Sequence, residues 1–166
     1  MLTRARGIDP RALDAVIAVA LVAGAVALGA AGEHHGPLTL LAAAAACATV
    51  AWRRRAPDVM TAVAVVTITV YGVSSHGAHG TFPSIEIAAV LDYYMLGRLS
   101  TERGRPEVDA GLLGAAVAAI VIVPGSSDAN RVATTWTLFV AVPFAVGRVV
   151  GSRVALTREL LSLIHI

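Results

Sequence analysis

The feature that most limits the fold of this chain is a series of long apolar blocks separated by short polar or basic clusters. Hydrophobic residues make up 57% of the 166 residues and charged residues 14%, against roughly 45–50% and about 25% in soluble domains. Each block is about long enough to cross a hydrocarbon core of roughly 30 Å, where every peptide group needs an internal partner. The Ala, Val and Leu runs lack the strict alternation of a membrane β-barrel. The sequence therefore predicts an all-α, polytopic bundle of transmembrane helices.

Helix-starting residues divide the chain into about six short spans. Asp9 and Pro10 predict the N-cap and the first residue of span one, and Pro37 and Pro57 start the next two spans. Asp128 is the expected cap of the last span, and Pro143 within it predicts a kink. The six predicted spans cover residues 15–31, 37–52, 57–74, 84–99, 110–123 and 132–150.

The placement of the basic residues predicts the orientation in the membrane. All thirteen are arginines, and short cytoplasmic loops retain positive charge. If successive spans alternate in direction, only Arg131 falls on the outer side. The other arginines are Arg4, Arg6, Arg11, Arg53, Arg54, Arg55, Arg98, Arg103, Arg105, Arg148, Arg153 and Arg158. We therefore expect a multi-pass protein of the inner or plasma membrane with both termini in the cytoplasm.

Three segments carry a resemblance to a known family. They are Asp14-Ala15-Val16 at the start of span one, residues 51–57 (Ala-Trp-Arg-Arg-Arg-Ala-Pro), and Gly147-Arg148 at the end of span six. This pattern resembles the N-terminal membrane domain of sensor histidine kinases of the nitrate-response and desaturase-regulating type, which are abundant in high-GC Gram-positive bacteria. The resemblance implies a homodimeric input domain that passes an envelope or bilayer signal through the last span to a cytoplasmic kinase. It also implies ATP-dependent histidine phosphorylation and a cognate response regulator, that is, a two-component phosphorelay.

The same resemblance suggests a domain division. Residues 1–151 are the predicted transmembrane sensor domain, and residues 152–160 begin the cytoplasmic signalling helix. Residues 161–166 resemble a peptide that is often produced when a reading frame continues into the sequence of a sequencing adaptor. We therefore expect these residues to be a non-native tail, and the chain to be a fragment that lacks the kinase module. Arg158-Glu159-Leu160 matches the start of the family's phosphoacceptor box, but leucine and serine follow where histidine and aspartate belong. His165 therefore receives no role.

No motif for catalysis, cofactor binding or nucleic-acid binding is found in the sequence. Histidines in the predicted outer loops, with nearby glutamates, suggest either a zinc or copper site, or a pH sensor, or ordinary polar loop filling. These metal candidates are His34, His35, His76 and His79. Cys47, the single cysteine, is predicted to pack as a small apolar side chain.

Asp92 is the strongest candidate for a functional residue inside the membrane, because it falls near the middle of span four. One interpretation is a structural hydrogen bond to Tyr71, Thr67 or a tyrosine of its own span. The other is a polar pathway, which would make the chain a small transporter or channel subunit organised around Asp92. Asp14 lies nearer a helix end, where snorkelling explains it.

The end of span six has features of a signalling helix. Gly147 and Gly151 form a Gly-X-X-X-Gly pattern that allows close helix approach. Together with Pro143 they are expected to permit two arrangements of the span. A coiled-coil seam is predicted from steps of three and four residues. Its members are Val146, Val149, Arg153, Leu156 and Leu160.

The orientation is directly testable with reporter fusions. Fusions at Arg55 and Arg105 should report the cytoplasm, because both positions lie in arginine-rich connections. Fusions at His35, His79 and Ser127 should report the exterior. Reversed outcomes at two adjacent connections would rule out the six-span arrangement.

Overall fold

In the computed structural model the residues 9–31, 36–74, 83–123 and 128–164 are described, and all their regular elements are helices. This confirms the prediction of an all-α fold. The elements are α1 (Pro10–Ala31), α2 (Pro37–Ala48), the 3₁₀ turn η1 (Thr49–Ala51), α3 (Pro57–Ser74), α4 (Pro83–Arg103), α5 (Pro106–Ile122), α6 (Ala129–Trp136), the π-helical segment η2 (Thr137–Ala141) and α7 (Val142–Ile164).

The predicted helix starts are confirmed at both ends of the chain. Oδ1 of Asp9 accepts a hydrogen bond from the backbone N–H of Arg11 at 3.0 Å, and Oδ1 of Asp128 accepts one from Asn130 at 3.0 Å. Five helices begin with proline, whose missing N–H costs nothing in the first turn of a helix. The side chains at these starts therefore place the helices as the sequence indicated.

The hydrophilic connection between the fourth and fifth spans is shorter than predicted. Helix α4 continues to Arg103 and α5 begins at Pro106, so most of residues 100–109 are helical. Gly104, with φ of 60°, turns the chain between them in the left-handed region that glycine favours. The sequence suggested a longer loop because charged residues are abundant here, whereas in the structure they occupy helix ends.

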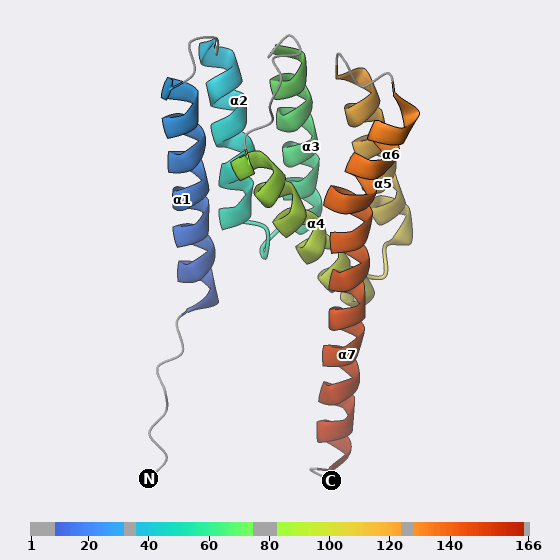
Figure 1. Cartoon of the computed structure of the whole chain (residues 1–166). Coiled ribbons are helices and arrows are strands. Elements are labelled where there is room, and N and C mark those ends of the chain that lie inside the picture. The colour runs from blue at the N-terminus through green and yellow to red at the C-terminus, as the bar shows by residue number, and fades with distance from the viewer. Residues whose placement is uncertain (1–8, 32–35, 75–82, 124–127, 165–166) are drawn as a thin grey trace.

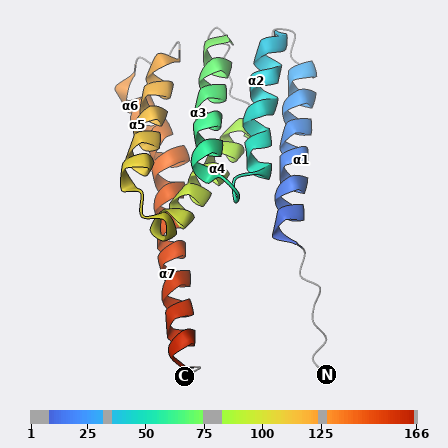
Figure 2. The same cartoon turned by 180° about the vertical axis from the view of Figure 1, so that it is seen from behind.

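The helices form two groups, joined by α4 and by direct packing of α3 against α5. Helices α1, α2 and α3 stand side by side, and α5, α6 and α7 form the other group (Figure 1). Helix α4 runs obliquely across the bundle, and the reverse view shows it behind α2 and α3 (Figure 2). One apolar core includes Ala18, Cys47, Tyr71 and Ala88 from the first four helices. The second core packs α4 against α5, η2 and α7, so α4 contributes to both.

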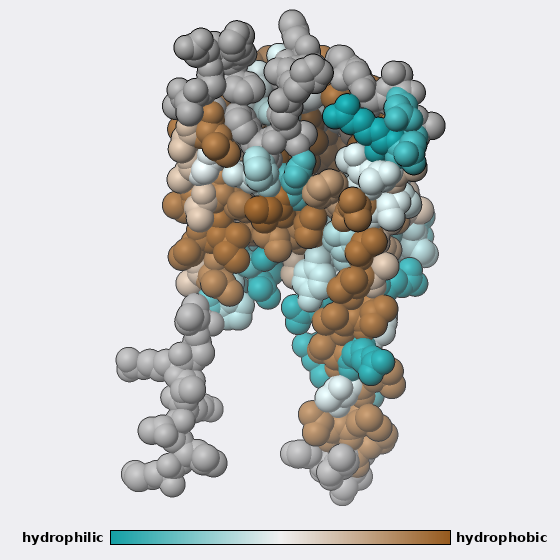
Figure 3. Space-filling model, viewed as in Figure 1, coloured by the Kyte–Doolittle hydropathy of each residue, from teal (hydrophilic) through white to brown (hydrophobic). Residues whose placement is uncertain are grey.

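The outer surface of the bundle is largely apolar, as Figure 3 shows for one face. Three helical segments are long and apolar enough to cross a membrane, namely residues 10–28, 57–74 and 130–163. Residues 37–51 form a shorter apolar helix. Within the described residues, α4 and α5 do not reach that length and apolarity. Helix α4 carries five charged residues, and many of its residues are buried inside the bundle.

The last segment is one continuous helix through α6, η2 and α7. It extends past the other helices at the end of the bundle where α1 begins (Figure 1). The backbone N–H of Val142 donates to the carbonyl of Thr137, a spacing of five residues. Because Pro143 lacks an N–H and crowds the preceding turn, a widened turn accommodates it. The disturbance predicted at Pro143 therefore takes the form of a π-helical segment.

Candidate functional site

A buried ion pair connects the start of α1 to the turn that follows η1. Asp14 is 1% exposed and Arg53 is 5% exposed. Nη2 of Arg53 donates to Oδ1 of Asp14 at 2.7 Å, and Nε of Arg54 donates to the other carboxylate oxygen. One carboxylate therefore binds two guanidinium groups. The prediction that Asp14 snorkels to the surface is wrong, because the turn after η1 closes over it.

The local sequence explains why these groups meet. Helix α1 begins at Pro10, so Asp14 lies about one turn inside it, at the end of the bundle where α2 finishes. After η1 the chain turns, with the N–H of Arg55 donating to the carbonyl of Trp52 at 2.8 Å. This turn directs Arg53 inward and leaves Arg54 partly exposed. Removing one partner of such a buried pair typically costs about 3–5 kcal/mol.

Asp92 of α4 lies beside this ion pair. It is fully buried, and its Oδ2 is hydrogen-bonded to Oγ1 of Thr49 at 2.5 Å. A structural hydrogen bond was predicted, but its partner is Thr49 rather than Tyr71, Thr67 or a tyrosine of α4. The Thr67 hydroxyl donates to the carbonyl of Val63 at 2.8 Å. The oblique course of α4 brings Asp92 to Thr49, the first residue of η1 directly after α2.

Unsatisfied polar atoms mark this region. Oδ1 of Asp92 and the Nε and Nη1 atoms of Arg53 are buried without a hydrogen-bond partner. The positive charge of Arg53 also acts on Asp92. We call Asp14, Thr49, Arg53, Arg54 and Asp92 the polar cluster. Both aspartates stand out in the sequence, but the position of Arg53 beside both of them does not, because that contact depends on the tertiary arrangement.

Glycines hold α4 and α7 in backbone contact. A Cβ at Gly97 would collide with the carbonyl of Phe144, one at Gly147 with the carbonyl of Tyr94, and one at Gly151 with the carbonyl of Arg98. The close approach predicted for Gly147 and Gly151 is therefore confirmed, with α4 of the same chain as the partner. Gly97 was not identified from the sequence, where a single glycine in an apolar helix gives no distinguishing signal.

Further ion pairs lie at the end of the bundle where α1 begins. Arg103 at the end of α4 pairs with Asp58 at the start of α3, and both are partly buried. Arg158 of α7 pairs with Glu102 at 3.1 Å, and both side chains are exposed. Exposed pairs contribute little stability, so the Arg103 pair is the stronger link between α4 and its neighbours.

The predicted metal candidates His34, His35, His76 and His79 lie outside the described residues. Within the described ranges, no group of three or more histidine, cysteine, aspartate or glutamate side chains could hold a metal ion. Cys47 is buried in the apolar core, as predicted for a small packing side chain.

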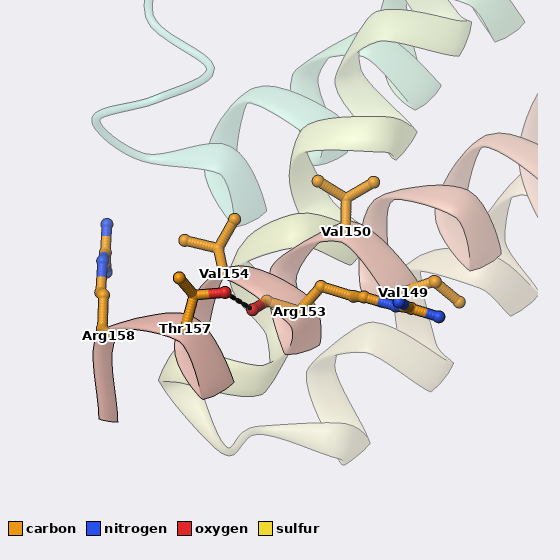
Figure 4. Close-up of a pocket in the computed structure, with 6 residues that line it drawn as sticks. All are labelled: Val149, Val150, Arg153, Val154, Thr157 and Arg158. Atoms are coloured by element: carbon orange, nitrogen blue, oxygen red, sulfur yellow. Dashed lines mark hydrogen bonds between the residues drawn. The ribbon is translucent and has the colours of Figure 1, made fainter. Parts of the chain in front are cut away.

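The surface of the described residues includes two grooves, and Asp92 lines neither. One follows α7 and is lined by Val149, Val150, Arg153, Val154, Thr157 and Arg158. Figure 4 shows the guanidinium groups of Arg153 and Arg158 pointing away from each other, so they do not form a joint anion site. The other groove lies between the ends of α2 and α3 that are remote from the polar cluster.

The fold and the polar cluster define an all-α helical bundle in which three helical segments are long and apolar enough to cross a membrane, with a charged group buried at the junction of α1, η1 and α4. The chain belongs to the family described as a domain of unknown function, DUF7134, which matches residues 3–159. Comparison with curated proteins and with solved structures gave no match.

The α4–α7 crossing yields a prediction with a matched control. Gly97→Ala should lower the free energy of unfolding by about 1–3 kcal/mol, because the added Cβ meets backbone rather than a movable side chain. Gly114→Ala on α5 has open space at its Cβ, and should be neutral or stabilising because alanine favours a helix. Thermal unfolding in detergent, followed by circular dichroism, measures both. Equal melting temperatures would contradict the close packing.

Proposed function

We propose that this chain is the membrane-embedded input region of a two-component sensor histidine kinase. It receives an envelope or bilayer signal and passes it through α7 to a cytoplasmic kinase module. The observation that carries the proposal is the last helix, which continues without interruption from the bundle to well beyond it (Figure 1). A helix that only anchored the bundle would not need this extension.

The arrangement of the helices supports a cytoplasmic location for the projecting end of α7. Successive helices alternate in direction (Figure 1), so nearly all the arginines in the described ranges gather toward the end of the bundle where α1 begins and α2 finishes. Arg131, at the start of α6, is the exception. Since positive charge is retained on the cytoplasmic side, both termini are assigned to the cytoplasm of a multi-pass inner or plasma membrane protein.

The exposed seam of α7 supports a homodimer. Val146, Val149, Leu156 and Leu160 are each at least half exposed, and they follow steps of three and four residues with Arg153 between them. Two copies of α7 would bury these side chains in a parallel coiled coil. A charged residue within the seam weakens such a coil. A weak coil suits a helix that must change register with its partner.

The proposed mechanism is a change in the packing or rotation of α7. In this mechanism the π-helical segment before Pro143 changes its backbone conformation when α7 rotates. Gly147 and Gly151 allow α7 to shift along α4 while the two helices stay in contact. Phosphoryl transfer from ATP to histidine, and then to a cognate response regulator, takes place in the kinase module. This membrane region needs no cofactor for its part.

The competing function is a small transporter or channel subunit organised around Asp92. The packing of Asp92 against Thr49, away from both grooves, favours the sensor. Recovering the uninterrupted gene distinguishes the two. A histidine–aspartate box and an ATP-binding domain after Leu160 support the sensor, whereas a stop codon or more spans support the transporter.

Insertions after Arg153 test the coupling through α7 in the full-length protein. One inserted alanine rotates everything downstream by about 100° and should lock or abolish kinase output. Seven inserted residues return the seam to within about 20° of its original face and should largely restore output. Membrane insertion, measured by fractionation, should be unchanged in both variants. Equal output from the two would show that α7 serves only as an anchor.

A further inference from the structure

The Thr49 hydroxyl lies between two oxygen atoms at hydrogen-bonding distance. Its Oγ1 is 2.6 Å from the carbonyl oxygen of Ala46 and 2.5 Å from Oδ2 of Asp92. A threonine hydroxyl has one hydrogen, and neither a backbone carbonyl nor an ionised carboxylate can supply another. Two short contacts need two hydrogens. The second is present only if Asp92 is a protonated carboxylic acid.

We propose that Asp92 is a proton-binding site, and that in this structure the proton is on Oδ2. The acid donates to Oγ1 of Thr49, which in turn donates to the carbonyl of Ala46. The unpartnered Oδ1 is then the carbonyl oxygen of a neutral acid. Leaving this atom without a partner costs much less than leaving a carboxylate oxygen without one.

The surroundings of Asp92 explain how it stays neutral beside an arginine. Arg53 reaches it from the turn after η1, but the carboxylate of Asp14 on α1 already binds Arg53 at 2.7 Å. Among the buried side chains of the polar cluster, the charges of Asp14 and Arg53 therefore balance when Asp92 is protonated, while the charge of Arg54 is partly exposed to solvent. Cys47 of α2 and Tyr93 of α4 are the nearby titratable groups that sense its charge.

The remaining neighbours of α4 also carry titratable or polar groups. Tyr71 of α3 is buried in the same apolar core as Cys47. The Tyr93 hydroxyl donates to the carbonyl of Leu112 on α5 at 3.3 Å. Helix α7 meets α4 through Gly97 and the backbone of Phe144. Asp92 thus faces α1, α2 and η1, on the side of α4 away from α7.

Loss of the proton would rearrange the polar cluster. The proton passes from Oδ2 to solvent water, the Thr49 hydroxyl turns to donate to the new carboxylate, and the carbonyl of Ala46 loses that hydrogen bond. The Nε and Nη1 atoms of Arg53, now without partners, become donors for Asp92. Arg53 is then shared between Asp14 and Asp92, which draws α4 toward the turn after η1. Since α4 contacts α7 through Gly97, the movement reaches α7.

The proton is thus the proposed ligand of the membrane region. Its connection to α7 rests on the proposed sensor function, whereas proton binding itself does not. The test therefore has two separate readouts. One is the protonation of Asp92 in the purified chain, and the other is kinase output in the full-length protein.

Infrared difference spectroscopy of the chain in lipid nanodiscs measures the protonation directly. We expect a carbonyl stretching band of a protonated carboxylic acid at neutral pH, which shifts in D₂O and on ¹³C labelling of aspartate. The band should be lost as pH rises and should be absent from Asp92→Asn. Asp58→Asn is the matched control and should retain it, because Asp58 is paired with Arg103. The proposal would be overturned if the wild-type spectrum showed no band at neutral pH that Asp92→Asn removes.

Two variants keep the proposal falsifiable if Asp92→Asn does not fold. Thr49→Val keeps the shape of the side chain but removes the hydroxyl, whereas Thr49→Ser keeps the hydroxyl. Because the carboxylate loses the stronger hydrogen bond, Thr49→Val should raise the proton affinity about tenfold, and Thr49→Ser should leave it nearly unchanged. Identical titrations of the two variants would contradict the relay through Thr49.

Kinase output separates proton binding from coupling. Asp92→Asn resembles the protonated state, so it should fix output at its acidic level and remove the pH response, whereas Asp58→Asn should alter output less. If the band is present but kinase output is the same in the wild type and in Asp92→Asn, the proton site stands and its coupling to α7 is overturned. If no kinase module exists, the infrared result still decides the proton site.

Discussion

The fold depends on satisfying the charges of Asp14 and Arg53 inside an apolar bundle. A single buried charge in such a place is expensive, whereas a hydrogen-bonded pair is tolerated. The two side chains come from α1 and from the turn after η1, and their pairing fixes how these segments approach. Helix α4 then packs against them with Asp92 facing the pair. The position of the most buried helix is thus set by a polar requirement as well as by apolar packing.

The oblique course of α4 makes it the mechanical junction of the molecule. On one side its Asp92 joins the polar cluster with α1 and η1, and on the other its Gly97 touches the backbone of α7. A shift of α4 therefore changes both contacts at once. This arrangement gives a physical route from the interior of the bundle to the projecting helix, which the proposed signalling role would use.

Local features were predictable from the sequence, and tertiary ones were not. Asp9, Asp128 and the prolines placed the helix starts correctly, since caps act within one turn. The predicted hydrogen-bond partner of Asp92 was wrong, because the oblique path of α4 cannot be deduced from spans assumed to be parallel. The observed partner is Thr49. The burial of Asp14 was missed for a similar reason, as its partner Arg53 lies 39 residues away along the chain. The outer histidines fall outside the described residues, so their role stays a prediction.

A double-mutant cycle tests most directly whether the buried pair organises the bundle. The variants Asp14→Asn, Arg53→Gln and their combination would be unfolded reversibly in mixed micelles, beside the equivalent cycle for the exposed pair of Glu102 and Arg158. We predict a coupling free energy above about 2 kcal/mol for the buried pair and below about 1 kcal/mol for the exposed pair. Equal coupling energies in the two cycles would contradict the account.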